Sequence, residues 1–301
     1  MIEIRELTKH FGRTVAVDGL SFTVHPGQVT GFLGANGSGK STTMRAVLGL
    51  DRATSGEALV NGKRYPSIQR PMFEVGALLD AGAVHGGRTA LAHLRCLGLS
   101  NGIGADRART VLERVGLGGV ANKRVGGFSL GMKQRLGIAA ALLGDPGVLL
   151  FDEPVNGLDP EGIRWIRTLM RDLAAEGRTV LVSSHLMSEM ALTADHVVVI
   201  GRGRLITETS MSDLTARSHR DVLVATPDPD GLAPVLRAAG GDVRPDGADL
   251  VVTGLTPAEI GDLALRSACA IHGLTPRSAS LEDAYLELTD DFVSYRAEAL
   301  R

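Results

Sequence analysis

The sequence predicts an α/β fold with a mixed central sheet, an antiparallel β subdomain at the amino terminus, a helical subdomain and a small α+β domain at the carboxyl terminus. Three observations lead to it. A glycine-rich turn at residues 34–42 stands between a short apolar strand and a helix. Two further apolar strands, 148–152 and 179–183, are joined by the helical stretch 163–176, an arrangement that forms a parallel pair. Beyond residue 211, short strands and helices alternate.

The first 25 residues predict the antiparallel sheet. Three β-favouring segments, IEIREL, TVAVD and LSFTV, are separated by Gly12 and Gly19, as in a meander of three strands. The pattern then changes to one apolar strand at 28–33, followed by the glycine-rich turn and by helical residues 42–50. This change begins the central sheet.

Residues 88–143 predict the helical subdomain. Thr89 and Ser129 stand directly before the helical segments LAHLRCLGL and LGMKQRLGIAAALL, where their hydroxyls could cap the helices. A hairpin at 196–207 follows the parallel strands. We therefore predict a first domain at 1–211.

Residues 212–301 are predicted to form a small α+β accessory domain. Strand-like segments at 221–225, 242–244 and 250–253 alternate with helical segments at 232–239 and 257–267, as in a split β-α-β unit. The segment contains no cluster of residues typical of catalysis. We expect a role in regulation or in dimer support.

Composition and charge exclude several classes of protein. The 32 basic and 34 acidic residues give a net charge of −2, which argues against a dedicated nucleic-acid-binding protein. Cys96 and Cys269 lack the paired spacing of a zinc or redox site, so we expect two small buried side chains in a reducing compartment.

The sequence also argues against secretion and against a membrane span. The amino terminus carries charges where a signal peptide needs an apolar core. The most apolar stretch, 136–151, is broken by Asp145 and Pro146 and is shorter than the ~20 apolar residues of a membrane helix. We expect a soluble, cytosolic chain whose membrane pathway, if it serves transport, belongs to another polypeptide.

The segment 34–42, GANGSGKST, matches the phosphate-loop pattern G-x-x-x-x-G-K-[ST] at every fixed position. Its glycines allow backbone N–H groups to face phosphates, Lys40 neutralises their charge, and Ser41 offers a hydroxyl to Mg²⁺. Between a strand and a helix, this motif predicts the ATP site of a P-loop NTPase. The nucleotide-binding residues of the loop are predicted to be Gly34, Asn36, Gly37, Ser38, Gly39, Lys40, Ser41 and Thr42.

Two carboxylates follow the strand at 148–152, in the sequence VLLFDEP. Asp152 ends the strand, where α/β sheets place their ligands, and could hold Mg²⁺. Glu153 is the candidate general base for an attacking water. The alternative is that both are solvated turn residues.

Three further segments complete an ordered set. SLGMKQ at 129–134 begins a helix and could cap a phosphate, NGLDP occupies 156–160, and His185 follows the strand TVLVSS. Together with the phosphate loop and the carboxylates, this set resembles the ATP-binding cassette of ABC transporters over roughly residues 1–210.

The resemblance implies a role for each segment. Asp159 meets a partner subunit, His185 senses the γ-phosphate, and Phe11 stacks on adenine, where the family usually has tyrosine; the alternative for Phe11 is an ordinary core position. The implied signature residues that contact nucleotide are Ser129, Gly131 and Gln134.

The chain departs from the family pattern at two places. The signature has Leu130 and Met132 beside Gly131, where smaller residues or glycine are common. Asp80, in VGALLDAGA, stands where the family's glutamine loop has glutamine. A carboxylate there could approach Mg²⁺ but adds negative charge beside the phosphates, so we expect slower or altered hydrolysis. Alternatively, Asp80 is an ordinary loop residue.

Within the family, the chain resembles the bacitracin- and daunorubicin-type drug-export branch, which carries a carboxyl-terminal extension ending much like SLEDAYLELT at 280–289. The resemblance implies an ATP-hydrolysing subunit that binds MgATP, pairs head to tail with a second copy, and powers a separate permease from the cytoplasmic face of the membrane. Export of small hydrophobic compounds or drugs is the implied transport, and the permease is expected to dock near residues 80–95.

The alternatives are a soluble ABC-type ATPase acting on nucleic acid or ribosomes, and a catalytically weak regulatory subunit. The sequence does not identify the cargo.

Overall fold

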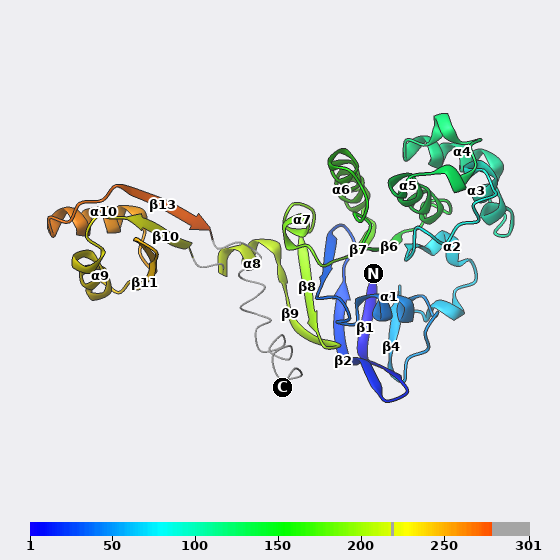
Figure 1. Ribbon diagram of the computed structural model, residues 1–301. Coiled ribbons are helices and arrows are strands. Elements are labelled where there is room, and N and C mark those ends of the chain that lie inside the picture. The colour runs from blue at the N-terminus through cyan, green and yellow to red at the C-terminus, as the bar shows by residue number, and fades with distance from the viewer. Residues whose placement is uncertain (218–219, 279–301) are drawn as a thin grey trace. The chain divides into compact units, whose positions relative to one another are not determined.

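The computed structural model describes residues 1–217 and 220–278 of the chain (Figure 1). They divide into two compact units, one of residues Met1–Met211 and one that begins at Ser212. The segment 280–289, used above for the branch resemblance, lies outside the described residues. No helix within residues 1–217 and 220–278 combines the length and the apolar character that a membrane span requires.

The first unit is built on a mixed six-stranded sheet with the order β5-β6-β7-β3-β8-β9. Neighbouring strands are parallel from β5 to β8, and only β8 and β9 are antiparallel. Every residue of β3 and β7 is buried, as expected for parallel strands covered on both faces. The predicted mixed sheet is therefore confirmed. Its strands are β3 Val29–Leu33, β5 Val75–Leu78, β6 Val148–Asp152, β7 Thr179–Ser184, β8 His196–Gly201 and β9 Arg204–Ser210.

An antiparallel sheet of the order β2-β1-β4 forms the amino-terminal subdomain, from β1 Ile2–Phe11, β2 Thr14–Val24 and β4 Ser55–Val60. The predicted break at Gly19 was wrong. Gly19 has a φ of +60° and lies inside β2, where the register with β1 shifts, so the glycine produces a bulge and the strand continues. The third strand is β4, which was not predicted from the sequence.

The two sheets of the first unit share one hydrophobic core. Side chains of the antiparallel sheet pack against the central sheet and the helix after β3, and the rings of Phe22 and Phe32 lie 5.2 Å apart between centroids. The buried members include Ile2, Leu7, Leu20, Phe22, Val24, Phe32, Met44, Leu150, Leu181 and Val198. This packing fixes the start of the glycine-rich turn that follows β3.

The predicted helical subdomain consists of α3, α4 and α5 (Figure 1). Helix α5 packs against the edge strand β5. Thr89 and Ser129 cap α3 and α5 as predicted, since their hydroxyls accept the N–H groups of Ala92 at 3.1 Å and Met132 at 3.2 Å. Cys96 is exposed, so the prediction of a buried side chain was wrong for it, and Cys269 is partly buried. The helices of the unit are α1 Lys40–Val47, α2 Pro71–Glu74, α3 Ala90–Leu99, α4 Ala105–Arg114, α5 Leu130–Ala141, α6 Pro160–Ala175 and α7 Met187–Ala191, with short 3₁₀ turns at Tyr65–Ser67, Gly118–Val120 and Val125–Gly127.

A chain of ion pairs connects α4 to the segments that lead into β6 and β7. Arg107 and Arg114 lie seven residues apart on α4, on one face; Arg107 pairs with Asp145 at 3.0 Å and Arg114 with Glu176 at 3.0 Å. Arg178 joins the two carboxylates, at 3.0 Å from Asp145 and 2.7 Å from Glu176. Burial raises the pKa of Asp145, but the two arginines outweigh it and hold the pKa below its usual value.

The second unit has the β-α-β-β-α-β order of a split β-α-β fold. Its antiparallel sheet has the order β11-β12-β10-β13, so that β12 lies between β10 and β11. A separate core of apolar residues from strands and helices holds it together. This agrees with the predicted α+β domain. Helix α8, Met211–Arg217, begins at the last residue of the first unit. The elements of the second unit after it are β10 Arg220–Ala225, α9 Pro229–Ala238, β11 Asp242–Asp246, β12 Asp249–Thr253, α10 Pro257–Arg266 and β13 Gly273–Ser278.

Candidate functional site

The glycine-rich turn between β3 and α1 has a backbone that side chains would obstruct. A Cβ on Gly34 would lie 2.4 Å from the Ser38 hydroxyl, and one on Gly39, whose φ is +109°, would lie 2.6 Å from the Ala16 carbonyl. Gly39 precedes α1 and supplies no side-chain cap. The N–H groups of the first helical turn, which have no partner within a helix, therefore remain available to an anion.

Lys40 places a positive charge inside this turn. The side chain is 6% exposed, and its Nζ donates to the carbonyls of Gly34 at 2.6 Å and Ala35 at 3.3 Å. Nζ also lies 3.7 Å from Glu153 Oε1. Burial lowers the pKa of Lys40, while the carboxylates of Glu153 and Asp152 act in the opposite direction. The turn and the two carboxylates therefore form one electrostatic unit.

The two carboxylates lie at the end of β6. Glu153 has a φ of +48°, in the left-handed region that costs a residue with a side chain about 1–2 kcal/mol. Its Oε2 lies 2.8 Å from His185 Nδ1. Asp152 Oδ1 accepts a hydrogen bond from the hydroxyl of Ser183, and the same hydroxyl accepts the N–H of Glu153 at 2.9 Å. Ser183 was not predicted as a site residue, and the only signal for it in the sequence is its position two residues before His185.

The phosphate loop and Glu153 line a cavity of about 190 Å³, whereas Asp152 and His185 do not line it. Gly34 and Ser38 support the turn without lining the cavity. Its lining consists of Ala16, Asn36, Gly37, Gly39, Lys40, Ser41, Thr42 and Glu153.

Two of the three predicted metal ligands fit a magnesium ion. The hydroxyl-bearing Ser41 lines the cavity and is exposed, and Asp152 Oδ2 makes no hydrogen bond to any described residue. No group of three or more His, Cys, Asp or Glu side chains in residues 1–217 and 220–278 could hold a metal. This donor set suits Mg²⁺, which takes one or two protein ligands and completes its shell with phosphate and water oxygens.

The structure does not bring the third, Asp80, to the cavity. Its carboxylate is exposed and accepts the N–H of Gly82 at 2.7 Å, as in an ordinary Asx turn. This favours the alternative of a loop residue.

Phe11, at the end of β1, is 49% exposed, and Lys9 Nζ lies 4.7 Å from the centre of its ring. The alternative of a core position for Phe11 was therefore wrong. An exposed ring remains available to stack on a planar ligand.

The signature segment lies on α5 and packs against the loop that follows Glu153. A Cβ on Gly131 would lie 3.3 Å from Leu158 Cδ2, so glycine allows a close approach there. Ser129 is occupied as the cap of α5, and Asp159 caps α6 by accepting the N–H of Gly162 at 2.8 Å. Ser129, Gly131 and Asp159 do not line the cavity of their own chain.

Gln134 was predicted to contact nucleotide, but its side chain is bonded within the chain. It is 6% exposed, and its Nε2 donates to the carbonyl of Asn156 at 3.2 Å. Its Oε1 is buried and has no hydrogen-bond partner among the described residues. The hydrogen bond joins the signature helix to the loop after Glu153. Burial of the side chain keeps Gln134 from contact with an external ligand.

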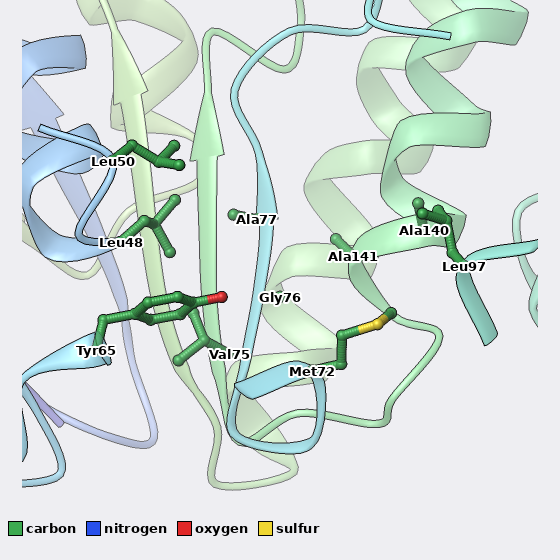
Figure 2. A pocket seen from close by; sticks show the side chains of 10 residues that line it. All are labelled: Leu48, Leu50, Tyr65, Met72, Val75, Gly76, Ala77, Leu97, Ala140 and Ala141. Atoms are coloured by element: carbon green, nitrogen blue, oxygen red, sulfur yellow. The ribbon is translucent and has the colours of Figure 1, made fainter. Parts of the chain in front are cut away.

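A second cavity, of about 260 Å³, lies where the helical subdomain meets the core (Figure 2). Figure 2 shows that apolar side chains approach β5 from both sides, with the ring of Tyr65 between Leu48 and Val75. Residues 80–95, where a docking groove was predicted, do not line this cavity. Its lining consists of Leu48, Leu50, Tyr65, Met72, Val75, Gly76, Ala77, Leu97, Ala140 and Ala141.

Comparisons with known proteins agree on the similarity of this chain to ABC transporter ATP-binding proteins. Residues 17–156 match the family model described as ABC transporter, and residues 220–282 match a domain of unknown function, DUF8746. The chain is 34% identical over 295 residues to the uncharacterized ABC transporter ATP-binding protein YhcH of Bacillus subtilis (strain 168), covering 97% of this chain and 96% of that protein. It is 40% identical over 226 residues to the bacitracin transport ATP-binding protein BcrA of Bacillus licheniformis, covering 73% of each.

A solved structure of similar fold is cbiO1 from Clostridium perfringens, part of the ABC transporter complex cbiONQ. The similarity has a TM-score of 0.63 at 28% identity and covers 72% of this chain and 90% of that one.

Proposed function

We propose that this chain hydrolyses ATP to drive a separate membrane permease. The premise is that the chain belongs to the family of ABC transporter ATP-binding proteins. The observation that carries the proposal is the shared cavity of the glycine-rich turn and Glu153. Binding groups for phosphate and a candidate base for water line the same small space. That arrangement supports phosphoryl transfer to water.

Each group that lines the cavity or contacts its lining has a proposed task. The amides of the turn and Lys40 bind the phosphates and neutralise charge that develops during transfer. Glu153 accepts the proton of the attacking water, and its hydrogen bond to His185 orients the carboxylate. Ser41 and Asp152 would hold Mg²⁺, which supplies positive charge to the phosphate oxygens when bound.

We further propose that two copies complete the site. Ser129 and Gly131 do not line the cavity of their own chain, and in the proposed pair they contact the nucleotide held by the second copy. Shifting such a pair from mostly open to mostly closed needs about 5.5 kcal/mol of differential binding, which contacts to the γ-phosphate can supply. Hydrolysis removes those contacts and reopens the pair.

We propose that the permease docks at the apolar cavity between the core and the helical subdomain. Apolar lining from both subdomains lets a docked segment respond when one moves against the other. The similarity to a bacitracin transport protein supports export of small hydrophobic compounds or drugs, with the chain on the cytoplasmic face of the membrane.

The proposed function is tested by Glu153→Gln. The amide cannot accept the water's proton, so we expect ATP turnover to fall by roughly 10²–10⁴-fold while MgATP still binds. Because ATP then persists in the site, size-exclusion chromatography should show a stable dimer with MgATP. Phosphate release and equilibrium binding are the measurements.

Glu161→Gln is the matched control, since Glu161 is exposed in the first turn of α6 and does not line the cavity. It should leave turnover unchanged. A Glu153→Gln protein that turns over ATP at the wild-type rate contradicts the base assignment. A wild-type protein that binds ATP without releasing phosphate, alone or with its permease, supports the regulatory alternative.

A further inference from the structure

One buried hydroxyl is hydrogen-bonded to both Asp152 and Glu153, the two acidic residues at the end of β6. Ser183 is on β7, directly opposite Asp152 in the parallel pairing of β6 and β7, and is 0% exposed. Its hydroxyl donates to Asp152 Oδ1 and accepts the N–H of Glu153 at 2.9 Å. The single proton of the hydroxyl is thus used on the carboxylate, and an oxygen lone pair is used on the amide.

The first bond orients Asp152. With Oδ1 held by Ser183, the carboxylate can rotate little, and Oδ2 is the oxygen left without a hydrogen bond to a described residue. A group that fixes one oxygen of a metal-binding carboxylate directs the other.

The second bond holds the backbone of Glu153. With a φ of +48°, Glu153 turns out of the strand, and its N–H is directed to the Ser183 hydroxyl. The Glu153 carbonyl accepts the N–H of Asn156 at 3.2 Å, so the peptide groups on both sides of the residue are fixed. The left-handed turn directs the Glu153 side chain toward Lys40 and His185.

We infer that Ser183 is a positioning residue for ATP hydrolysis: its hydroxyl sets the orientation of Asp152 and the backbone of Glu153 together, without contacting the nucleotide. The inference rests on the proposed function, because it assigns a task to both carboxylates. One side chain in this position couples the predicted metal ligand to the predicted base, so its loss affects metal affinity and turnover together.

The neighbouring Ser184 provides a matched control. It is also 0% exposed, and its hydroxyl bonds to Leu186, accepting the N–H at 2.9 Å and lying 3.4 Å from the carbonyl. It makes no hydrogen bond to Asp152 or Glu153. Ser184→Ala therefore removes an equally buried hydroxyl from the same strand without touching the carboxylates.

The experiment compares full-length wild type, Ser183→Ala, Ser183→Thr and Ser184→Ala. Mn²⁺ replaces Mg²⁺ so that metal affinity in the presence of ATP can be measured by electron paramagnetic resonance, and phosphate release gives kcat and KM. For Ser183→Ala we expect Mn²⁺ affinity and kcat to fall by roughly 10–100-fold. ATP affinity without metal should stay within about threefold of wild type, because the phosphate-binding loop is untouched. Ser183→Thr retains the hydroxyl and should restore both values, and Ser184→Ala should leave Mn²⁺ affinity unchanged.

The inference is overturned if Ser183→Ala and Ser184→Ala show the same Mn²⁺ affinity and kcat. A wild-type chain that binds Mn²⁺ and ATP but does not hydrolyse ATP defeats the proposed function alone, and the Mn²⁺ comparison still decides the role of Ser183. A wild-type chain that binds no Mn²⁺ with ATP overturns both.

Discussion

Gln134→Leu is expected to raise the free energy of unfolding of the protein and to lower its rate of ATP turnover. Gln134 is nearly fully buried on α5, with its Nε2 bonded to the Asn156 carbonyl and its Oε1 unpartnered among the described residues. Leucine has a similar helix propensity and brings no polar atom into the core. The substitution therefore isolates the energetics of one buried amide.

The magnitude follows from two opposing contributions. Removing a buried carbonyl without a partner relieves a desolvation penalty of about 1–3 kcal/mol, and losing the hydrogen bond to Asn156 costs about 0.5–1.5 kcal/mol. Asn156 is exposed, so its freed carbonyl can bond to water. The difference is a net stabilisation of about 1 kcal/mol, equivalent to a rise in Tm of about 2–4 °C for a unit of this size.

Turnover is expected to fall severalfold, because the Asn156 segment that holds the Glu153 carbonyl loses its attachment to the signature helix. Urea unfolding gives the free energy, and phosphate release gives the rate. Gln69→Leu makes the same chemical change at an exposed site and should alter neither quantity. A loss of more than about 1 kcal/mol in Gln134→Leu would refute the reasoning, since it would mean that Oε1 is satisfied by a partner such as a buried water.

Two further predictions concern the ion pairs and the apolar cavity. Asp145→Asn should lower the free energy of unfolding at pH 7. The arginine neighbours hold the folded pKa of Asp145 below 3.8. The difference in unfolding free energy between wild type and variant should therefore persist above pH ~4 and shrink as the pH falls through the folded pKa. Urea unfolding across this range measures that difference, and an equal difference at every pH contradicts the prediction. Leu50→Glu places a charge at the rim of the apolar cavity, where Leu50 is 57% exposed, and should weaken co-sedimentation with membranes containing the permease by roughly tenfold or more without changing ATP affinity. Leu192→Glu, at 55% exposure and outside the cavity lining, is its control, and equal effects of the two would contradict the docking proposal.

Much of the fold could be predicted because its signals are local. The phosphate-loop pattern, the strand VLLFD and the caps Thr89 and Ser129 depend on residues close in sequence, and the structure places β6 at the predicted residues. The antiparallel sheet was predicted less well. Its strand β4 pairs with β1 across more than 40 residues, and the sequence SGEALV carries a glycine and a charge that weaken a strand pattern.

The contacts within the site were harder to predict because they depend on register. Ser183 gains its two hydrogen bonds only because β6 and β7 pair Asp152 with Ser183, and no local pattern encodes that alignment. Gln134 was assigned to nucleotide from its motif, but the helix turns it inward. Cys96 was expected to be buried from its residue type alone, whereas α3 presents it to solvent.

The contact between α5 and the loop after Glu153 has an evolutionary consequence. A Cβ at Gly157, whose φ is +75°, would lie 2.2 Å from Leu130 Cδ2. Where a homologue carries glycine at position 130, this obstruction disappears, and position 157 can accept asparagine or aspartate, which tolerate a left-handed backbone. The two positions should therefore covary across the family, with a large residue at one found beside glycine at the other.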